Sequence, residues 1–267
     1  MTKRALCIGI NNYPGTANDL NGCVNDANDW AEELKGRGFA VDVLLDQAAT
    51  KKGTLAGIEK LIGDSKYGDI LVISYSGHGT WVPDENGDEK DFRDEAICPH
   101  DIDTGALITD DELHELFLTR ERGVRLVMIS DSCHSGTLAR FAPAIGSDIH
   151  EKVRFLSPEI PLRHDALKLE PARATDRAAR PRGLSRSSAL LFAGCQDSEF
   201  SWDASFNGRA NGAFTRVALD VLRAAKPATY HDWFRAIRAK LPSVDYPQTP
   251  NLSGTSTQKK WPALRES

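Results

Sequence analysis

The sequence contains no apolar run long enough to cross a membrane. Its longest apolar stretches, ALLFAG and DILVISY, are far shorter than the roughly 20 residues that a spanning helix needs. The segment KRALCIGI at residues 3–10 is too brief an apolar run for a secretory signal. The sequence therefore predicts neither a membrane anchor nor a secreted protein.

The sequence has neither a paired-cysteine motif nor an excess of positive charge. The five cysteines, an odd number among 267 residues, are scattered without any C-x-x-C pair. This pattern is typical of a reducing compartment rather than a disulfide framework, so we expect a cytoplasmic protein. The net charge of -5 argues against a surface that coats nucleic acid, and we expect no nucleic-acid partner.

Strand-like and helix-like segments alternate along the chain. This alternation predicts an α/β fold with a mostly parallel sheet and helices on both faces. Thr109 and Glu112 have the spacing of a capping box at the start of one helix. Short apolar runs predict strands at 4–10, 40–45, 69–79, 124–130 and 188–194, and helical periodicity predicts helices at 19–38, 50–65, 109–120, 212–225 and 229–241.

The pattern fails over residues 142–187. This segment holds five prolines and seven arginines without sustained periodicity, so we expect a long exposed loop or flexible linker. The linker would divide the chain into regions 1–141 and 188–267.

A cysteine and a histidine lie at the ends of two neighbouring predicted strands. DSCHSG places Cys133 just after the strand 124–130, and YSGHG places His78 at the end of the strand 69–79. In parallel sheets the carboxyl ends of the strands meet at one edge, where ligands bind. The adjacent His134 would point away from Cys133 in an extended segment, so His78 is the better base.

This pair suits acyl transfer. A nearby imidazole raises the thiolate fraction of a cysteine and protonates the leaving amine. The backbone N–H groups of Gly79 and Cys133 are candidates for the donors that stabilise the oxyanion. A cysteine can instead be a buried structural residue. We expect this for Cys7, Cys23, Cys98 and Cys195, because the sequence supplies no histidine partner for them.

The motifs YSGHG and DSCHSG resemble those of the caspase-like cysteine peptidases, specifically the metacaspase and bacterial orthocaspase branch. The likeness extends over ALCIGINNY and CVNDA, and more loosely over LFAGCQDSE and NGAFT. It implies a three-layer caspase-like fold with a sheet of about six strands, in which 1–141 is large-subunit-like and 188–267 small-subunit-like. It also implies a His78–Cys133 dyad and cleavage of protein or peptide substrates after Arg or Lys.

The resemblance further implies an acidic pocket for the residue before the scissile bond. Its members here would be Asp26 and Asp131, with Cys23 and Ser76 lining it. Asp26 could instead be a helix-surface carboxylate and Asp131 a strand-end cap. A peptidase of this specificity would be expected to cleave itself within its arginine-rich linker, between Arg154 and Arg186.

Calcium is the cofactor that the family resemblance suggests. Calcium-activated metacaspases bind the ion through aspartates, for which the candidates here are Asp94, Asp110 and Asp111. Arg140 stands where the family often has a further aspartate. An arginine at this position would remove an oxygen ligand for calcium and would repel the ion. We therefore expect that no cofactor is required. A zinc site from the CPH and CH pairs lacks the usual ligand spacing, and the acidic loop 83–95 does not fit an EF-hand.

Two other functions stay open. Some members of such a fold are binding or scaffold modules without catalysis. The same dyad could also serve a hydrolase of a non-peptide amide.

Overall fold

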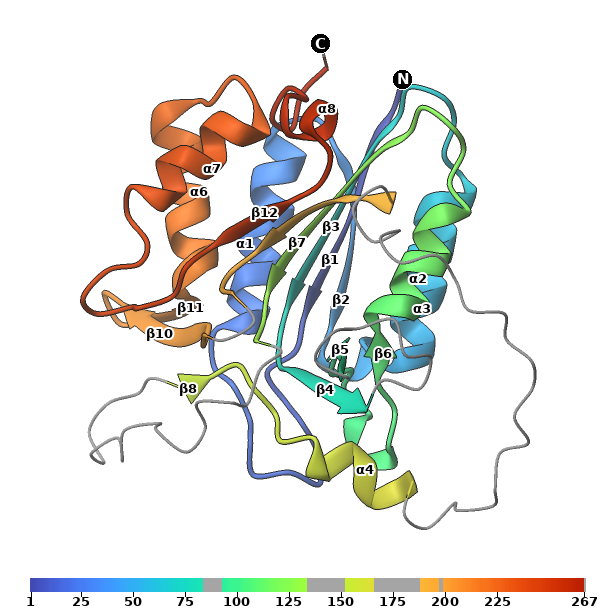
Figure 1. Ribbon diagram of the computed structural model, residues 1–267, viewed down its shortest axis with the longest axis vertical. Coiled ribbons are helices and arrows are strands. Elements are labelled where there is room, and N and C mark those ends of the chain that lie inside the picture. The colour runs from blue at the N-terminus through green and yellow to red at the C-terminus, as the bar shows by residue number, and fades with distance from the viewer. Residues whose placement is uncertain (84–92, 134–151, 166–187, 197–198, 267) are drawn as a thin grey trace.

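Figure 1 shows the computed structural model of the chain, which describes residues 1–83, 93–133, 152–165, 188–196 and 199–266. A central sheet of six strands has the order β12-β9-β7-β3-β1-β2. β12 is antiparallel to β9, and all other neighbours in this sheet are parallel. The strands are β1 (Lys3–Gly9), β2 (Ala40–Leu45), β3 (Ile70–Ser76), β7 (Arg125–Asp131), β9 (Leu190–Ala193) and β12 (Asn251–Ser253). The α/β fold with a mostly parallel sheet is confirmed.

Helices cover both faces of this sheet. α1 (Cys23–Gly36), α6 (Ala213–Ala225) and α7 (Tyr230–Arg238) pack on one face, and α2 (Lys51–Gly63) and α3 (Asp110–Leu118) on the other (Figure 1). Every residue of β3 is buried because each of its two faces meets a helix layer. No helix in the described part of the chain is both long and apolar enough to span a membrane.

Two small sheets lie where the central parallel strands end (Figure 1). One has the order β11-β10-β8 and the other β4-β5-β6. Both frame the carboxyl edge of the main sheet, where the candidate residues His78 and Cys133 were expected. Their strands are β4 (Gly79–Pro83), β5 (Arg93–Ile97), β6 (Ile108–Thr109), β8 (Lys152–Val153), β10 (Trp202–Phe206) and β11 (Arg209–Gly212), and the short helices are η1 (Asp46–Ala48), η2 (Ile102–Thr104), α4 (Glu159–Asp165) and α8 (Ser256–Lys259).

The expectation of an exposed loop does not hold for residues 152–165. They form β8 and α4, and Arg154 and Leu156 are each 0% exposed. An arginine is almost never fully buried unless it is paired, so Arg154 must have acidic partners inside the molecule. The proline-rich composition did not reveal this because the partners lie far away in the sequence.

Candidate active site

The pairing of β3 with β7 brings His78 and Cys133 together. Ser76, the last residue of β3, is in register with Asp131, the last residue of β7. Because the strands are parallel, His78 and Cys133 each follow that pair by two residues and leave the sheet at the same edge. The register thus places both residues at one edge of the sheet.

The imidazole of His78 is held by a backbone carbonyl. Its Nε2 lies 2.6 Å from the carbonyl oxygen of Asn18, so Nε2 carries the proton and donates it. Its Nδ1 is buried and has no hydrogen-bond partner among the described residues. Burial lowers the pKa of His78 to about 4, so the ring is neutral at pH 7 with Nδ1 as a free base.

Two tyrosines fix the turn that carries His78. The hydroxyl of Tyr13 accepts the N–H of His78 at 2.8 Å, and the hydroxyl of Tyr75 donates to the His78 carbonyl at 2.6 Å. A Cβ at Gly77 would fall 2.6 Å from both hydroxyl oxygens, which is too close for any side chain. The glycine before His78 is therefore required by the two tyrosines.

One carbonyl oxygen lies between the two catalytic candidates. The N–H groups of Gly79 and Cys133 both donate to the carbonyl oxygen of Arg154, at 3.0 and 3.2 Å. These are the two donors that the sequence predicted for an oxyanion. Arg154 thus presents its peptide carbonyl to the site as a substrate would.

The sulfur of Cys133 lies against the backbone of Ser201. It accepts the N–H of Ser201 and is 3.5 Å from the Ser201 carbonyl oxygen. Cys195 is a neighbour: its thiol donates to the Ser132 carbonyl at 3.4 Å, and its pKa is raised, first by its hydrogen bond with Cys133 and then by burial. Cys195 therefore remains a protonated thiol beside Cys133.

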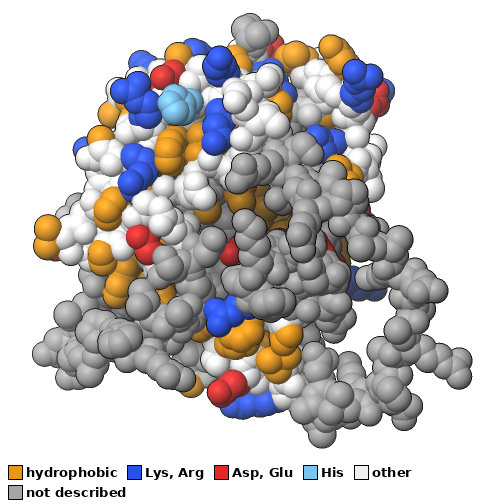
Figure 2. Space-filling view, in the orientation of Figure 1, with side chains coloured by type: hydrophobic (Ala, Val, Ile, Leu, Met, Phe, Trp, Pro, Cys, Tyr) orange, Lys and Arg blue, Asp and Glu red, His pale blue; other side chains and the backbone are white. Residues whose placement is uncertain are grey.

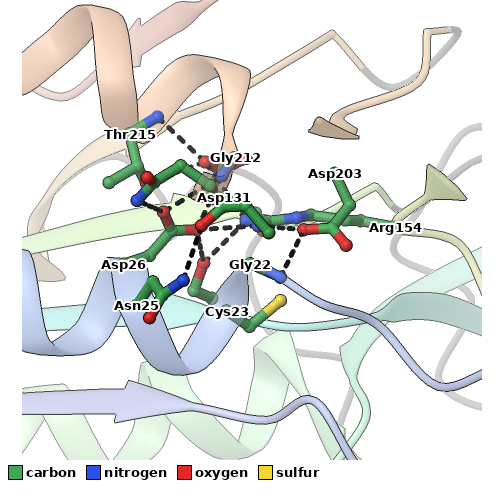
Figure 3. Close-up of polar contacts among 12 residues, drawn as sticks. Gly22, Cys23, Asn25, Asp26, Asp131, Arg154, Asp203, Gly212 and Thr215 are labelled. Carbon is green, nitrogen blue, oxygen red and sulfur yellow. Dashed lines mark hydrogen bonds and ion pairs between the residues drawn. The ribbon is translucent and has the colours of Figure 1, made fainter. Parts of the chain in front are cut away.

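The side chain of Arg154 lies in a buried acidic pocket (Figure 3). Its Nη2 is 2.7 Å from Asp26 and 3.0 Å from Asp203, and its Nη1 is 3.2 Å from Asp131. Nη1 also donates to the hydroxyl of Ser76 at 2.6 Å. The predicted pocket residues Asp26, Asp131 and Ser76 therefore meet around one guanidinium, together with Asp203, which sequence reasoning missed.

Each carboxylate of the pocket is held by further donors. Asp26 accepts from Asn211 Nδ2 at 2.9 Å, and Asp131 accepts the N–H of Thr215 at 2.9 Å. Asp203 accepts the N–H groups of Asn21 and Gly22 at 2.7 and 2.9 Å, and Asp26 also accepts the N–H of Gly212 at 3.0 Å. These fixed donors keep the carboxylates in place whatever occupies the pocket.

The pocket is negative even with the arginine in it. Three carboxylates, each at most 1% exposed, surround a single guanidinium. Burial raises the pKa of Asp26, and the neighbouring Asp131 raises it further, while Arg154 opposes both effects. These three carboxylates are buried, whereas the acidic side chains that can be seen on the face in Figure 2 are scattered.

Gly212 forms a wall of the pocket. A Cβ at this position would lie 2.5 Å from Nη1 of Arg154 and would also collide with the Asp131 carboxylate. Cys23 is fully buried, and burial raises the pKa of its thiol while the charge of Arg154 lowers it. It lies at the start of α1, next to Gly22, whose N–H donates to Asp203 (Figure 3). Gly212 is an additional lining residue.

The backbone on either side of Arg154 is hydrogen-bonded to neighbouring segments. β8 pairs antiparallel with β10, and the N–H of Arg154 donates to the Ser201 carbonyl at 3.0 Å. Lys152 donates through Nζ to the Asp19 carbonyl at 2.6 Å. After Arg154, the N–H of Leu156 donates to the Gly79 carbonyl at 2.9 Å. The segment adds a strand to β10, as peptide ligands often do.

The candidate calcium ligands lie elsewhere. Asp94 is on β5, and Asp110 and Asp111 are in the first turn of α3, where the helix dipole favours acids. Each of the three has an interaction partner in the structure. Among the described residues, no group of three or more His, Cys, Asp or Glu side chains is arranged to hold a metal ion. Arg140 lies outside the described residues.

The comparison with known families decides the assignment. The caspase domain family model matches residues 2–261. This chain belongs to the caspase family. It is 30% identical to Metacaspase-1B of Aspergillus oryzae over 94% of this chain and 67% of the relative. It is 32% identical to Metacaspase-1 of Mycosarcoma maydis over 95% of this chain and 70% of the relative. The chain thus spans 65 to 70% of the length of several such relatives.

Solved structures agree with this membership. A protein of Geobacter sulfurreducens is 33% identical and superimposes with a TM-score of 0.77, over 99% of this chain and 98% of that one. Caspase-1 of Spodoptera frugiperda, at 14% identity, has a TM-score of 0.58 over 94% of this chain and 86% of its own, and so shares the fold. The protein is a caspase-type cysteine endopeptidase by family, and the predicted resemblance is confirmed.

Proposed function

We propose that this caspase-family protein cleaves peptide bonds after Arg, and less efficiently after Lys, with Cys133 as nucleophile and His78 as general acid and base. The observation that carries this proposal is the position of Arg154. Its guanidinium is bound by Asp26, Asp131 and Asp203, while its carbonyl oxygen accepts the N–H groups of Gly79 and Cys133. A side chain and a scissile carbonyl are thus recognised together.

The charge of the pocket supports the preference for a basic residue. Three buried carboxylates face one cation, so an acidic side chain there would be repelled at short range in a low dielectric. Arg also fits better than Lys because its planar fork presents two nitrogens to separate partners, Nη1 to Ser76 and Asp131 and Nη2 to Asp26 and Asp203. An ammonium group can occupy only one of these positions.

The geometry supports an acyl-enzyme mechanism. The Cys133 thiolate attacks the carbonyl carbon, and the oxygen that becomes negative accepts the N–H groups of Gly79 and Cys133. His78 takes the thiol proton at Nδ1 and gives it to the leaving nitrogen, while the Asn18 carbonyl holds Nε2–H. Water then hydrolyses the thioester with His78 as base.

The same position suggests the first substrate. Arg154 is the residue before a peptide bond whose carbonyl is already bound by the two N–H donors, so the Arg154–Phe155 bond is the proposed site of self-cleavage. This bond lies at the upstream end of the interval that the sequence suggested. The new chain would begin at Phe155.

Fluorogenic peptides test the specificity directly. Peptides with Arg, Lys or Asp before the reporter group are offered to the wild type and to Cys133→Ala. We expect turnover in the order Arg, Lys, Asp, and none by Cys133→Ala. Efficient turnover of the Asp peptide would refute the acidic-pocket assignment.

A covalent thiol-directed Arg probe separates the two alternative functions. A scaffold module would neither bind the probe covalently nor hydrolyse any peptide. A hydrolase of non-peptide amides would be labelled at Cys133 and yet leave all peptides intact. The proposal requires both labelling and turnover in the wild type, and neither in Cys133→Ala.

A further inference from the structure

The residues that follow the proposed cleavage site are anchored independently of Arg154. Phe155 forms a parallel bridge with Gly79, and the N–H of Leu156 donates to the Gly79 carbonyl at 2.9 Å. The side chain of Leu156 is 0% exposed and belongs to the apolar cluster beneath α2 and α3. A fully buried leucine is a strong anchor, because releasing it would expose its whole apolar side chain to water.

The chain beyond Leu156 adds to this anchor. α4 begins three residues later and packs against η2, and Ile160 of α4 contacts the same apolar cluster. On the other side of the bond, Arg154 has its own anchors in the three aspartates and in the Ser201 carbonyl. Breaking the Arg154–Phe155 bond does not itself remove the contacts on either side, so the two ends stay adjacent until Arg154 leaves the pocket to an external substrate.

This arrangement has a chemical consequence for the acyl-enzyme. After cleavage, the Phe155 amine would remain beside the thioester formed between Cys133 and Arg154, because Leu156 keeps it there. Groups held in this way reach effective concentrations of about 10⁵–10⁸ M in favourable geometry, far above what a free amine could supply. The retained amine thus competes with water for the thioester.

We propose that the site re-forms its own Arg154–Phe155 bond, acting as an intramolecular peptide ligase with Leu156 as the residue that positions the amine. This inference rests on the proposed self-cleavage. In the ligation step the nitrogen of Phe155 forms the amide bond to the Arg154 carbonyl carbon, and the bond from that carbon to sulfur breaks. The amine proton passes to Nδ1 of His78 and then to the Cys133 sulfur. No oxidant, reductant or cofactor is needed.

The test approaches the equilibrium from both directions. Intact wild-type protein, and wild-type protein already cleaved but with its pieces still associated, are incubated separately in buffer made with ¹⁸O water. The buffer is at about pH 8, near the pKa of an α-amino group, so that much of the amine is neutral. We expect both samples to reach the same ratio of intact to cleaved chain. Intact chain recovered from the initially intact sample should gain ¹⁸O in the Arg154 carbonyl, because a bond that has been hydrolysed and re-formed takes part of its carbonyl oxygen from water.

Two leucine variants show whether the anchor matters. Leu156→Ala should lower the ratio of re-formed to cleaved chain about tenfold or more, because a truncated anchor no longer confines the amine. Leu113→Ala is the matched control. Leu113 is a buried leucine of the same cluster, but it lies on α3 and not in the segment 154–156. It should change thermal stability but leave the ratio near that of the wild type.

The outcomes separate this inference from the proposed function. If intact wild type neither yields the two pieces nor gains ¹⁸O at Arg154, the self-cleavage fails and the ligation fails with it. If the pieces form but separate, or never rejoin, the ligation alone is refuted. A ratio that falls equally in Leu156→Ala and Leu113→Ala would refute the positioning role of Leu156, since general loss of stability would then explain it.

Discussion

Asp203 on β10 lies 3.0 Å from the guanidinium of Arg154, an ion pair in which both side chains are at most 1% exposed. The same nitrogen of Arg154 is 2.7 Å from Asp26 on α1. One buried cation therefore joins the first helix, the β8 segment and a hairpin near the end of the chain.

Removal of the buried cation should destabilise the fold. Arg154→Gln, made in a Cys133→Ala background so that no cleavage intervenes, leaves three buried carboxylates without their counter-charge. Breaking a buried pair in this way costs about 3–5 kcal/mol. Urea unfolding at neutral pH should show a loss of this size.

The loss should be smaller in acid. Burial and the neighbouring Asp131 raise the pKa of Asp26, and without Arg154 nothing of comparable charge opposes them, so protonation of Asp26 favours the folded state as pH falls. Arg209→Gln is the control, since Arg209 pairs with Asp29 at a partly exposed site and should cost about 1 kcal/mol or less. An Arg154→Gln effect no larger than that of Arg209→Gln would contradict the account of the pocket.

Specificity should depend on Asp26 and Asp203 but not on a nearby aspartate. Asp26→Ala should reduce kcat/KM for Arg peptides by roughly two to three orders of magnitude, and Asp203→Asn by a comparable factor, because each leaves the substrate cation short of a buried partner. Asp29→Asn is the matched control on the same helix, since Asp29 faces Arg209. Equal losses in all three variants would argue for a general effect on folding.

The pKa of His78, lowered to about 4 by burial, predicts a pH-dependent stability. Between pH 6.5 and about 4 the unfolded chain binds a proton at this histidine that the folded chain does not. The free energy of unfolding should therefore fall as pH falls through this window, by about 1.4 kcal/mol per pH unit, and be unaffected above it.

A comparison of two variants isolates this contribution. The pH dependence of urea unfolding is measured for Cys133→Ala and for Cys133→Ala combined with His78→Gln. The difference between the two curves should flatten above pH 6.5. If the curves are parallel down to about pH 4, burial does not lower the pKa of His78, and this part of the account is refuted.

Activity should not require calcium. The candidate ligands Asp94, Asp110 and Asp111 carry the charge for such a site, but Arg140 replaces the aspartate that the family often supplies there. A guanidinium removes an oxygen ligand and adds repulsion, which calcium binding tolerates poorly. We propose that turnover of Arg peptides survives EGTA and rises little with millimolar calcium. If EGTA abolishes turnover and calcium restores it, the three aspartates suffice.

The sequence reveals the catalytic candidates because their signals are local. The apolar runs before His78 and Cys133 predict neighbouring strands of a parallel sheet, and the residues that follow each strand share an edge for geometric reasons. The capping box at Thr109 and Glu112 is likewise a local pattern, and both of its hydrogen bonds are present. Asp26 and Asp131 came from family likeness, since nothing in their neighbourhood marks a pocket.

The sequence does not reveal Asp203 or the burial of Arg154, because each depends on partners far along the chain. β8 is a two-residue strand, too short to show any periodicity. The hairpin that carries Asp203 did leave a readable signal: Asn207 and Gly208 both have positive φ, at 54° and 80°, in the tight turn between β10 and β11. An Asn-Gly pair between short runs is a strong indicator of such a turn.

Intact mass measurement with amino-terminal sequencing tests the central claim most directly. Wild type and Cys133→Ala are purified and incubated side by side at neutral pH. The account predicts that the wild type yields a piece ending at Arg154 and a piece beginning at Phe155, while Cys133→Ala stays whole. A first cut at another arginine in the wild type, or the same cut in Cys133→Ala, would contradict the assignment of Arg154 as the bound substrate residue of this site.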